Sequence, residues 1–367
     1  MPDLPSPVLV ALAAALGGGL FGAVSQATGF CAMGAVSDLV LFGDRRRLRA
    51  WLLAAAVALF GAQALQGAGL IDLGPSAYLA TPTLPLAGAL LGGLTFGIGM
   101  TLAGGCGAKS LVRLGGGNLK ALLVLLVVGI SAMATLKGVL APLRQGFERL
   151  TALPLSPLGL SRPSLPALLE GAGLPPAAAV AVAVAGLGGG LAWWCLKDEG
   201  FRRSPADLGG GVAIGLLVPA GWATTGILGA DPFEPAALAS FSFVAPIGAA
   251  LVYLMTATGA SLSFAVASVG GVVAGAFAVA RWQGRFQLET FTDRDDFLRH
   301  LAGAALMGVG GVLAMGCTIG QGVTGLSTLA LASPLALAGL ILGAMIGLRR
   351  LETGSTAAAL GSLLCRR

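Results

Sequence analysis

The chain has 367 residues, of which 56% are hydrophobic and only 10% are charged, and its mean hydropathy is +0.89. A soluble domain carries about a quarter of its residues as charged side chains, so this composition excludes a water-soluble protein and indicates a chain that resides in lipid. The net charge of +6 does not indicate a nucleic-acid partner, because the basic residues cluster in short connections, where they orient membrane proteins.

The N-terminal segment is apolar but lacks the positively charged start of a secretory signal, so we interpret it as a retained membrane segment. A helix needs roughly 20 apolar residues to cross a bilayer, and the segments 50–70, 119–141 and 176–196 reach that length. The chain re-enters the membrane from about residue 85. These segments predict an all-α polytopic membrane protein.

Three basic clusters, at 45–49, 113–120 and 197–203, separate these segments. If the clusters are cytoplasmic, each apolar segment of the first half connects opposite sides of the membrane, so the topology is consistent. The N-terminus and the connections 71–84 and 142–175 then lie outside, the second of them as a long proline-rich loop.

The apolar segments after Pro205 are less regular and contain internal breaks. They run near 208–230, 236–256, 261–280, 300–330 and 335–348. The charged stretch 281–299 favours the cytoplasmic side, while the parity between 231 and 280 stays open.

An internal repeat divides the chain into two halves. Gly29–Gly34 aligns with Gly221–Gly226, and a triple glycine precedes each at the same offset. A second alignment, without gaps, matches Gly92, Gly97, Gly99, Gly105 and Cys106 with Gly303, Gly308, Gly310, Gly316 and Cys317.

The repeat predicts a first membrane repeat at 1–141 and a second, with the C-terminal segment, at 208–367. Residues 142–207 join them as a periplasmic loop, a connecting helix and a cytoplasmic loop. With one half starting outside and the other inside, the repeat is inverted. Such folds place broken or re-entrant helices around a central path at the repeat interface.

Three of the five cysteines, Cys31, Cys106 and Cys317, sit in glycine-flanked breaks of apolar segments. A break at membrane depth implies a cavity, because the freed backbone groups need partners. The new helix start carries partial positive charge, which suits an anion, and a thiol adds a soft S–H donor. The pattern indicates a path for a small sulfur-containing anion.

The remaining cysteines, Cys195 and Cys365, are interpreted as small buried apolar residues. With a single histidine and no Cys-x-x-Cys pair, the sequence predicts no metal site.

The residues flanking the three cysteines are candidate supporting residues of the path. They are Gly29, Gly105, Gly107, Lys109, Gly316, Thr318 and Gln321. Lys109 has two interpretations, which stay open. It is an intramembrane cation with a functional role, or, together with Arg113, it marks the cytoplasmic end of a span.

The strings around these cysteines carry a family resemblance. They are Gly29-Phe30-Cys31, Gly105-Cys106-Gly107 leading to Leu111–Lys120, and Gly316–Gly322 followed by Gly325–Thr328. Over nearly the whole chain the sequence resembles the YeeE/YedE family of bacterial sulfur transporters.

The resemblance implies thiosulfate uptake across the bacterial inner membrane, through an hourglass-like body of two inverted halves, to supply sulfur for cysteine synthesis. It maps three path cysteines onto Cys31, Cys106 and Cys317, which would pass the ion along by S–H hydrogen bonds without a cofactor. We see no sulfur-carrier domain in this sequence, so we expect the partners to be thiosulfate, the lipid bilayer and a separate cytoplasmic sulfurtransferase or sulfur-carrier protein.

Two alternatives stay open at the level of sequence. One is a transporter of another sulfur or selenium species, which the same breaks would serve. The other is a membrane thiol enzyme that forms a persulfide on Cys106, with Lys109 lowering the thiol pKa.

Overall fold

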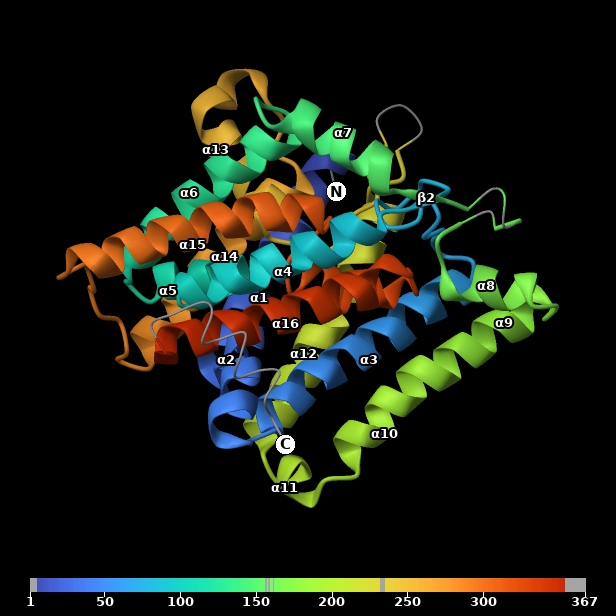
Figure 1. Ribbon diagram of the computed structural model, residues 1–367, viewed down its shortest axis with the longest axis horizontal. Coiled ribbons are helices and arrows are strands. Elements are labelled where there is room, and N and C mark those ends of the chain that lie inside the picture. Colours follow the sequence, from blue (N-terminus) through green and yellow to red (C-terminus); the bar gives the residue numbers. More distant parts are fainter. Residues whose placement is uncertain (1–4, 156, 158, 161, 232–234, 354–367) are drawn as a thin grey trace.

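The computed structural model describes residues 5–353 except 156, 158, 161 and 232–234, so Cys365 lies outside the described residues. Almost every described element is a helix (Figure 1). The described sheet consists of two short antiparallel strands, β1 (Thr83–Leu84) and β2 (Leu153–Pro154). The predicted all-α class is confirmed.

The first group of helices runs from the N-terminal segment to the basic connection at 197–203. In chain order it comprises α1 (Ser6–Thr28), α2 (Ala32–Ser37), η1 (Asp38–Phe42), α3 (Arg46–Gly67), α4 (Leu86–Leu102), α5 (Gly107–Gly115), α6 (Leu119–Leu136), α7 (Ala141–Thr151), α8 (Leu165–Gly171), α9 (Pro176–Ala183), η3 (Val184–Gly189), α10 (Gly190–Leu196) and α11 (Glu199–Arg202).

The second group follows this connection. It comprises α12 (Pro205–Ala223), η4 (Thr224–Leu228), α13 (Val244–Thr256), η5 (Ala257–Gly259), α14 (Phe264–Trp282), α15 (Arg294–Leu313), η6 (Gly320–Gly325) and α16 (Ala332–Thr353).

Eight helical stretches of the described chain are long and apolar enough to cross a membrane, which confirms the predicted multi-pass architecture. In three predicted segments the structure shows detail that the sequence did not give. The supposed loop 142–175 contains α8 and nearly all of α7, the segment 236–256 is extended until α13 begins, and α15 starts at Arg294, inside the charged stretch. A capping bond explains this last start, since the Asp293 carboxylate accepts the Asp296 N–H.

Small residues set the helix packing. A Cβ on Gly18 of α1 would lie 2.2 Å from the Ser268 carbonyl oxygen of α14, and one on Gly211 of α12 would lie 2.6 Å from the Ala50 oxygen of α3. Such contacts let backbones approach within lipid, where packing replaces the hydrophobic effect. α1 therefore packs on α14, and α12 packs on α3.

The two helices α4 and α15, matched by the gapless repeat, pack against each other reciprocally. A Cβ on Gly99 would meet the Gly303 oxygen at 2.6 Å, and one on Gly310 would meet the Gly92 oxygen at 2.7 Å. These two contacts exchange when each residue is replaced by its repeat partner, which is the signature of a local twofold relation. The order of the contacts makes α4 and α15 antiparallel.

Ion pairs involve the basic clusters at what we call the basic end of the molecule. Arg49 pairs with Asp198 at 2.7 Å, and Lys120 pairs with Asp296 at 2.8 Å. In Figure 1 this end faces left and lower left, and α3 and α6 run from it toward the upper right. The clusters that the sequence predicts to be cytoplasmic therefore lie at one end of the molecule.

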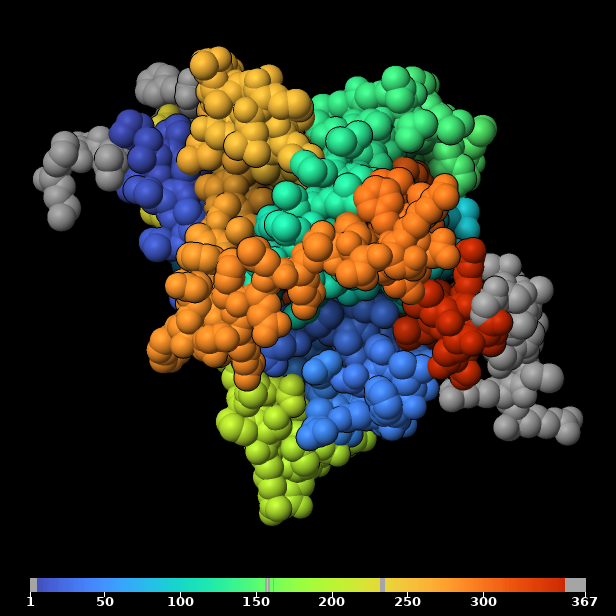
Figure 2. Space-filling model, turned by 90° about the vertical axis from the view of Figure 1, so that its left-hand side faces the viewer, coloured from blue at the N-terminus to red at the C-terminus, as the bar shows by residue number. Residues whose placement is uncertain are grey.

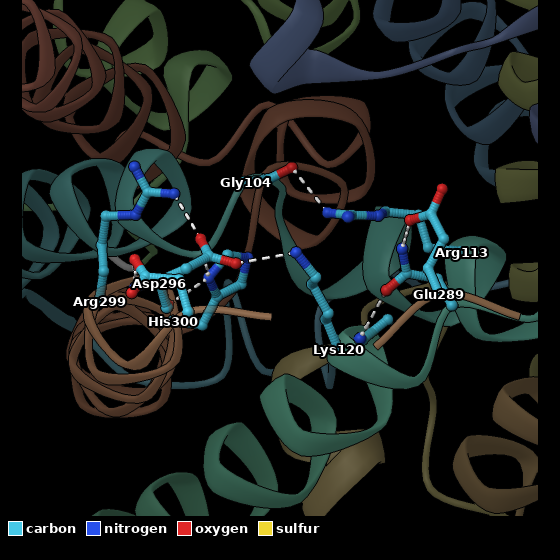
Figure 3. A network of polar contacts seen from close by, with 10 residues as sticks. Gly104, Arg113, Lys120, Glu289, Asp296, Arg299 and His300 are labelled. Carbon is cyan, nitrogen blue, oxygen red and sulfur yellow. Dashed lines mark hydrogen bonds and ion pairs between the residues drawn. The ribbon is translucent and has the colours of Figure 1, made fainter. Parts of the chain in front are cut away.

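A cluster of polar contacts lies at the basic end, around the start of α15 (Figure 3). Besides the Lys120 pair, Asp296 accepts a bond of 2.5 Å from Arg299, and Asn118 donates to Glu289. The Arg113 guanidinium donates to the Gly104 carbonyl oxygen at 3.2 Å. These contacts tie the start of α6 to the start of α15, and the end of α5 to the break that follows α4.

The segment 236–260, whose parity the sequence left open, enters and returns on one side. Its two flanks, 235–239 and 261–265, line one cavity together with Ser6 at the start of α1. We call this side the outer end. α12 and α14 therefore cross in opposite directions with a re-entrant segment between them.

Candidate functional site

The first break ends α4. Gly104 has φ +69°, a left-handed conformation that suits glycine, and the Gly105 N–H donates back to the Met100 oxygen at 2.8 Å. Cys106 is then the N-cap residue of α5, and its sulfur lies beside the Lys109 N–H, outside hydrogen-bonding geometry. The break turns the chain and presents the thiol at a helix start.

The second break, after α15, repeats this pattern at the same offset. Met315 has φ +55°, and the Gly316 N–H donates to the Gly311 oxygen at 2.8 Å. The Cys317 sulfur accepts the Gly320 N–H at 3.4 Å. Two equivalent backbone turns therefore place two equivalent thiols.

The third break separates α1 from α2. Gly29 has φ +69° and donates its N–H to the Ser25 oxygen at 3.1 Å, and the Cys31 sulfur accepts the Gly34 N–H at 3.3 Å. Its aligned counterpart, Gly221–Gly226, is helical through α12 and η4. Gly221 serves packing instead, since a Cβ there would lie 2.5 Å from the Ser240 hydroxyl.

The three breaks meet around one cavity, the thiol cavity. Its lining includes Cys31, Cys106 and Thr318, and the Cys106 sulfur is close enough to those of Cys31 and Cys317 for electrostatic interaction. Cys106 and Cys317 are buried, whereas Cys31 is partly exposed. The cavity volume is about 10 Å³, which is enough for one water molecule. This conformation is therefore closed to a larger ion.

The predicted supporting residues play different parts. Lys109 borders the thiol cavity, is partly exposed, and has no carboxylate at ion-pair distance among the residues that the structure describes. Gln321 faces away from the cavity, donating to the Ala314 oxygen at 2.5 Å and accepting from Ser333 at 2.7 Å. It stabilises the second break.

The predicted glycines fit confined positions. A Cβ on Gly316 would lie 3.0 Å from the Gln321 nitrogen, and Cβ atoms on Gly105 and Gly107 would each lie 3.2 Å from a side-chain carbon. Gly29 has open space around it, so its left-handed φ is the reason for glycine there.

Sequence reasoning missed several residues of this region. Ser25 lines the thiol cavity, and its only signal is a polar residue within an apolar helix. Tyr78, in a connection predicted to lie outside, donates its hydroxyl to the Gly320 oxygen at 2.6 Å. Nothing local in the sequence connects Tyr78 with the second break.

Four phenylalanines separate the thiol cavity from the outer end. Phe21 lines the thiol cavity and lies 4.9 Å from Phe243 between ring centroids, while Phe264 lines a cavity of about 390 Å³ at the outer end and lies 5.4 Å from Phe241. Phe241 also stacks on Phe21 at 6.2 Å. We call these four rings the phenylalanine plug.

On the other side, Cys31 faces the basic end. A second small cavity there is lined by Cys31 with Arg47, Thr28 and Asp207, among others. Figure 2 shows this end hollowed between the orange segment around residues 280–300 and the blue segment that leads into α3. Cys31 thus lies between the thiol cavity and an opening toward the predicted cytoplasm.

Cys195 is buried away from the thiol cavity and donates its thiol to the Arg49 oxygen at 3.3 Å. Across the described residues, no group of three or more histidine, cysteine, aspartate or glutamate side chains is placed to hold a metal ion.

Comparison with known proteins decides the family. A family model described as sulphur transport matches residues 27–346. The chain belongs to this sulphur transport (YeeE/YedE) family. A protein named thiosulfate transporter TsuA from Spirochaeta thermophila is 29% identical over 338 residues, covering 89% of this chain and 94% of that protein. The protein of the same name from Escherichia coli is 25% identical over 330 residues, covering 83% and 84%.

These relatives are named as transporters, so the comparisons favour transport over the persulfide-forming enzyme.

Proposed function

We propose that this multi-pass membrane protein carries thiosulfate across the bacterial inner membrane, past Cys317, Cys106 and Cys31. The observation that carries the proposal is the convergence of three helix breaks, far apart in the sequence, on one narrow cavity bordered by thiols. The names of the two relatives supply the identity of the ion. In this scheme the halves 1–141 and 208–367 form an inverted pair, joined by 142–207.

The thiol geometry suits a mobile anion. The Cys31 and Cys317 sulfurs accept backbone N–H groups, which leaves each S–H hydrogen free to donate to an ion. Each such bond is weak, and conduction requires binding sites that an ion also leaves. Three weak donors in succession meet that requirement better than one tightly held arginine pair.

The membrane potential opposes entry. Moving one charge against 100 mV costs about 2.3 kcal/mol, so a dianion meets about 4.6 kcal/mol. Uptake must therefore be driven either by consumption of the ion inside or by coupling to protons. The clearest apolar spans, 50–70, 119–141 and 176–196, contain no carboxylate that could relay protons, which favours consumption. We propose that a separate cytoplasmic sulfurtransferase or sulfur-carrier protein consumes it and delivers the sulfur to cysteine synthesis.

The closed cavity sets the conformational requirement. An ion arriving from the outer end meets the phenylalanine plug, so its rings must move before the thiol cavity admits thiosulfate. On leaving Cys31 the ion meets the small cavity lined by Arg47 and Asp207, and then the hollow at the basic end, where water can solvate it.

The test is growth on thiosulfate as the sulfur source in a bacterium that lacks its own uptake systems. We expect Cys106→Ala and Cys317→Ala to abolish growth while the protein still reaches the membrane. Cys195→Ala is the matched control, because this buried thiol lies away from the cavity, and it should grow like wild type. Normal growth of both cavity variants would refute the thiol path.

A further inference from the structure

Two buried hydroxyl groups in the thiol cavity have no hydrogen-bond partner. Ser25 is 2% exposed and Thr318 is 0% exposed, both side chains line the cavity, and neither oxygen meets a protein donor or acceptor in hydrogen-bonding geometry. The group beside the Thr318 hydroxyl is the Cys106 sulfur, a weak acceptor that it does not meet in hydrogen-bonding geometry, so the hydroxyl has no nitrogen or oxygen partner among the described residues. A buried hydroxyl without a partner is unfavourable, so such a group calls for an explanation.

Other hydroxyls of these elements are satisfied. In the same helix as Ser25, Thr28 donates to the carbonyl oxygen four residues earlier at 2.8 Å, the usual solution for a helical hydroxyl. In the helix that follows Thr318, Thr324 donates to the Phe241 oxygen at 2.6 Å. Ser25 and Thr318 differ in facing the cavity with their donors unused.

We propose that the Ser25 and Thr318 hydroxyls are the oxygen-recognising groups of the transport path and determine its specificity. This inference rests on the proposed function. Thiosulfate has a soft terminal sulfur and three hard oxygens. The thiols contact the sulfur end, and the two hydroxyls donate to the oxygens once the cavity widens. The site then recognises both ends of the ion without a buried cation, which would hold a dianion too tightly to release it.

Ions that have only a sulfur end or only an oxygen end test whether the thiols recognise sulfur and the hydroxyls recognise oxygen. Sulfate offers oxygens alone, and hydrosulfide offers sulfur alone, so each engages one half of the site. We therefore expect sulfate to compete through the hydroxyls and hydrosulfide to compete through the thiols.

The experiment measures labelled thiosulfate uptake in proteoliposomes, with sulfate and hydrosulfide as competitors. Thr318→Val preserves shape and removes the hydroxyl, and we expect it to raise KM about tenfold, since a hydrogen bond to a charged group is worth at least that factor. Maximal uptake should change little. The sulfate concentration needed for half inhibition should rise in parallel, while that of hydrosulfide stays at the wild-type value. Thr318→Ser should restore both values.

Ser25→Ala should show the same pattern and carries the test if Thr318→Val does not reach the membrane. Ser76→Ala is the control, because Ser76 is also a buried hydroxyl without a partner but does not line the thiol cavity. A wild-type KM and unchanged sulfate competition in both cavity variants would overturn the inference. If wild type takes up thiosulfate and Cys106→Ala does not, that result leaves the transport proposal standing, whereas absent uptake by wild type refutes both.

Discussion

The two breaks that carry Cys106 and Cys317 share one backbone design but differ in what surrounds it. Both close with the same hydrogen bonds at equivalent positions. The first lies near the basic end, where the exposed Gly104 carbonyl meets an arginine. The second is buried except at the partly exposed Met315, and it is held by hydrogen bonds of Gln321, Ser333 and Tyr78. The two halves therefore share the same backbone turn. The first turn is exposed at Gly104, whereas the second is held by side-chain hydrogen bonds from its surroundings.

Removing the internal support of the buried break should give the largest effect. Gln321→Ala leaves the Ala314 oxygen and the Ser333 hydroxyl without partners and opens a gap, so we expect a loss of about 2–4 kcal/mol in stability. Thermal unfolding in detergent measures it. Thiosulfate uptake should fall with it, because Cys317 loses its fixed position. Unchanged melting would show that the second break does not depend on this side chain.

Substitutions at the left-handed positions of the two turns should change the stability of the protein in opposite directions. Met315→Gly relieves a non-glycine residue at φ +55° and should stabilise the protein by about 1 kcal/mol, whereas Gly104→Ala introduces the same strain and should destabilise it by about 1 kcal/mol. Melting temperatures of the two variants compare the turns directly. Shifts of the same sign would contradict the equivalence of the breaks.

Arg113, at the exposed break, should contribute less to stability than Gln321 does at the buried break. Arg113→Ala removes one solvent-accessible bond to Gly104, so we expect less than about 1 kcal/mol in stability. The same thermal unfolding measurement checks it. A loss as large as that of Gln321→Ala would contradict the contrast between the two breaks.

The smallest effect concerns pH at the basic end. Hydrogen bonds from Lys120 and then Arg299 hold the pKa of Asp296 at about 2, against burial, which raises it. A carboxylate whose pKa is lowered in the fold stabilises it above the unfolded value near 4, and this stability is lost as pH falls toward 2. Asp296→Asn should flatten the melting temperature across that window. An unchanged pH profile would show that the pair adds nothing.

The sequence located the thiols because glycine flanks each one and because cysteine is rare in this chain. It also located the α4 and α15 repeat, since helix crossings through Gly99 and Gly303 leave glycines at fixed spacing. It failed at Gly221–Gly226, where glycine serves packing rather than a break. The phenylalanine plug, Tyr78 and the two unused hydroxyls depend on long-range packing, which no local pattern records.

The most direct test of the thiol path is the flux of labelled thiosulfate into proteoliposomes that contain wild type, Cys106→Ala, Cys317→Ala or Cys195→Ala at equal protein density. If Cys106 and Cys317 contact the ion, thiosulfate should enter rapidly with wild type and with Cys195→Ala. With Cys106→Ala or Cys317→Ala, it should enter only at the rate of protein-free liposomes. Entry at the wild-type rate with both Cys106→Ala and Cys317→Ala would contradict the account.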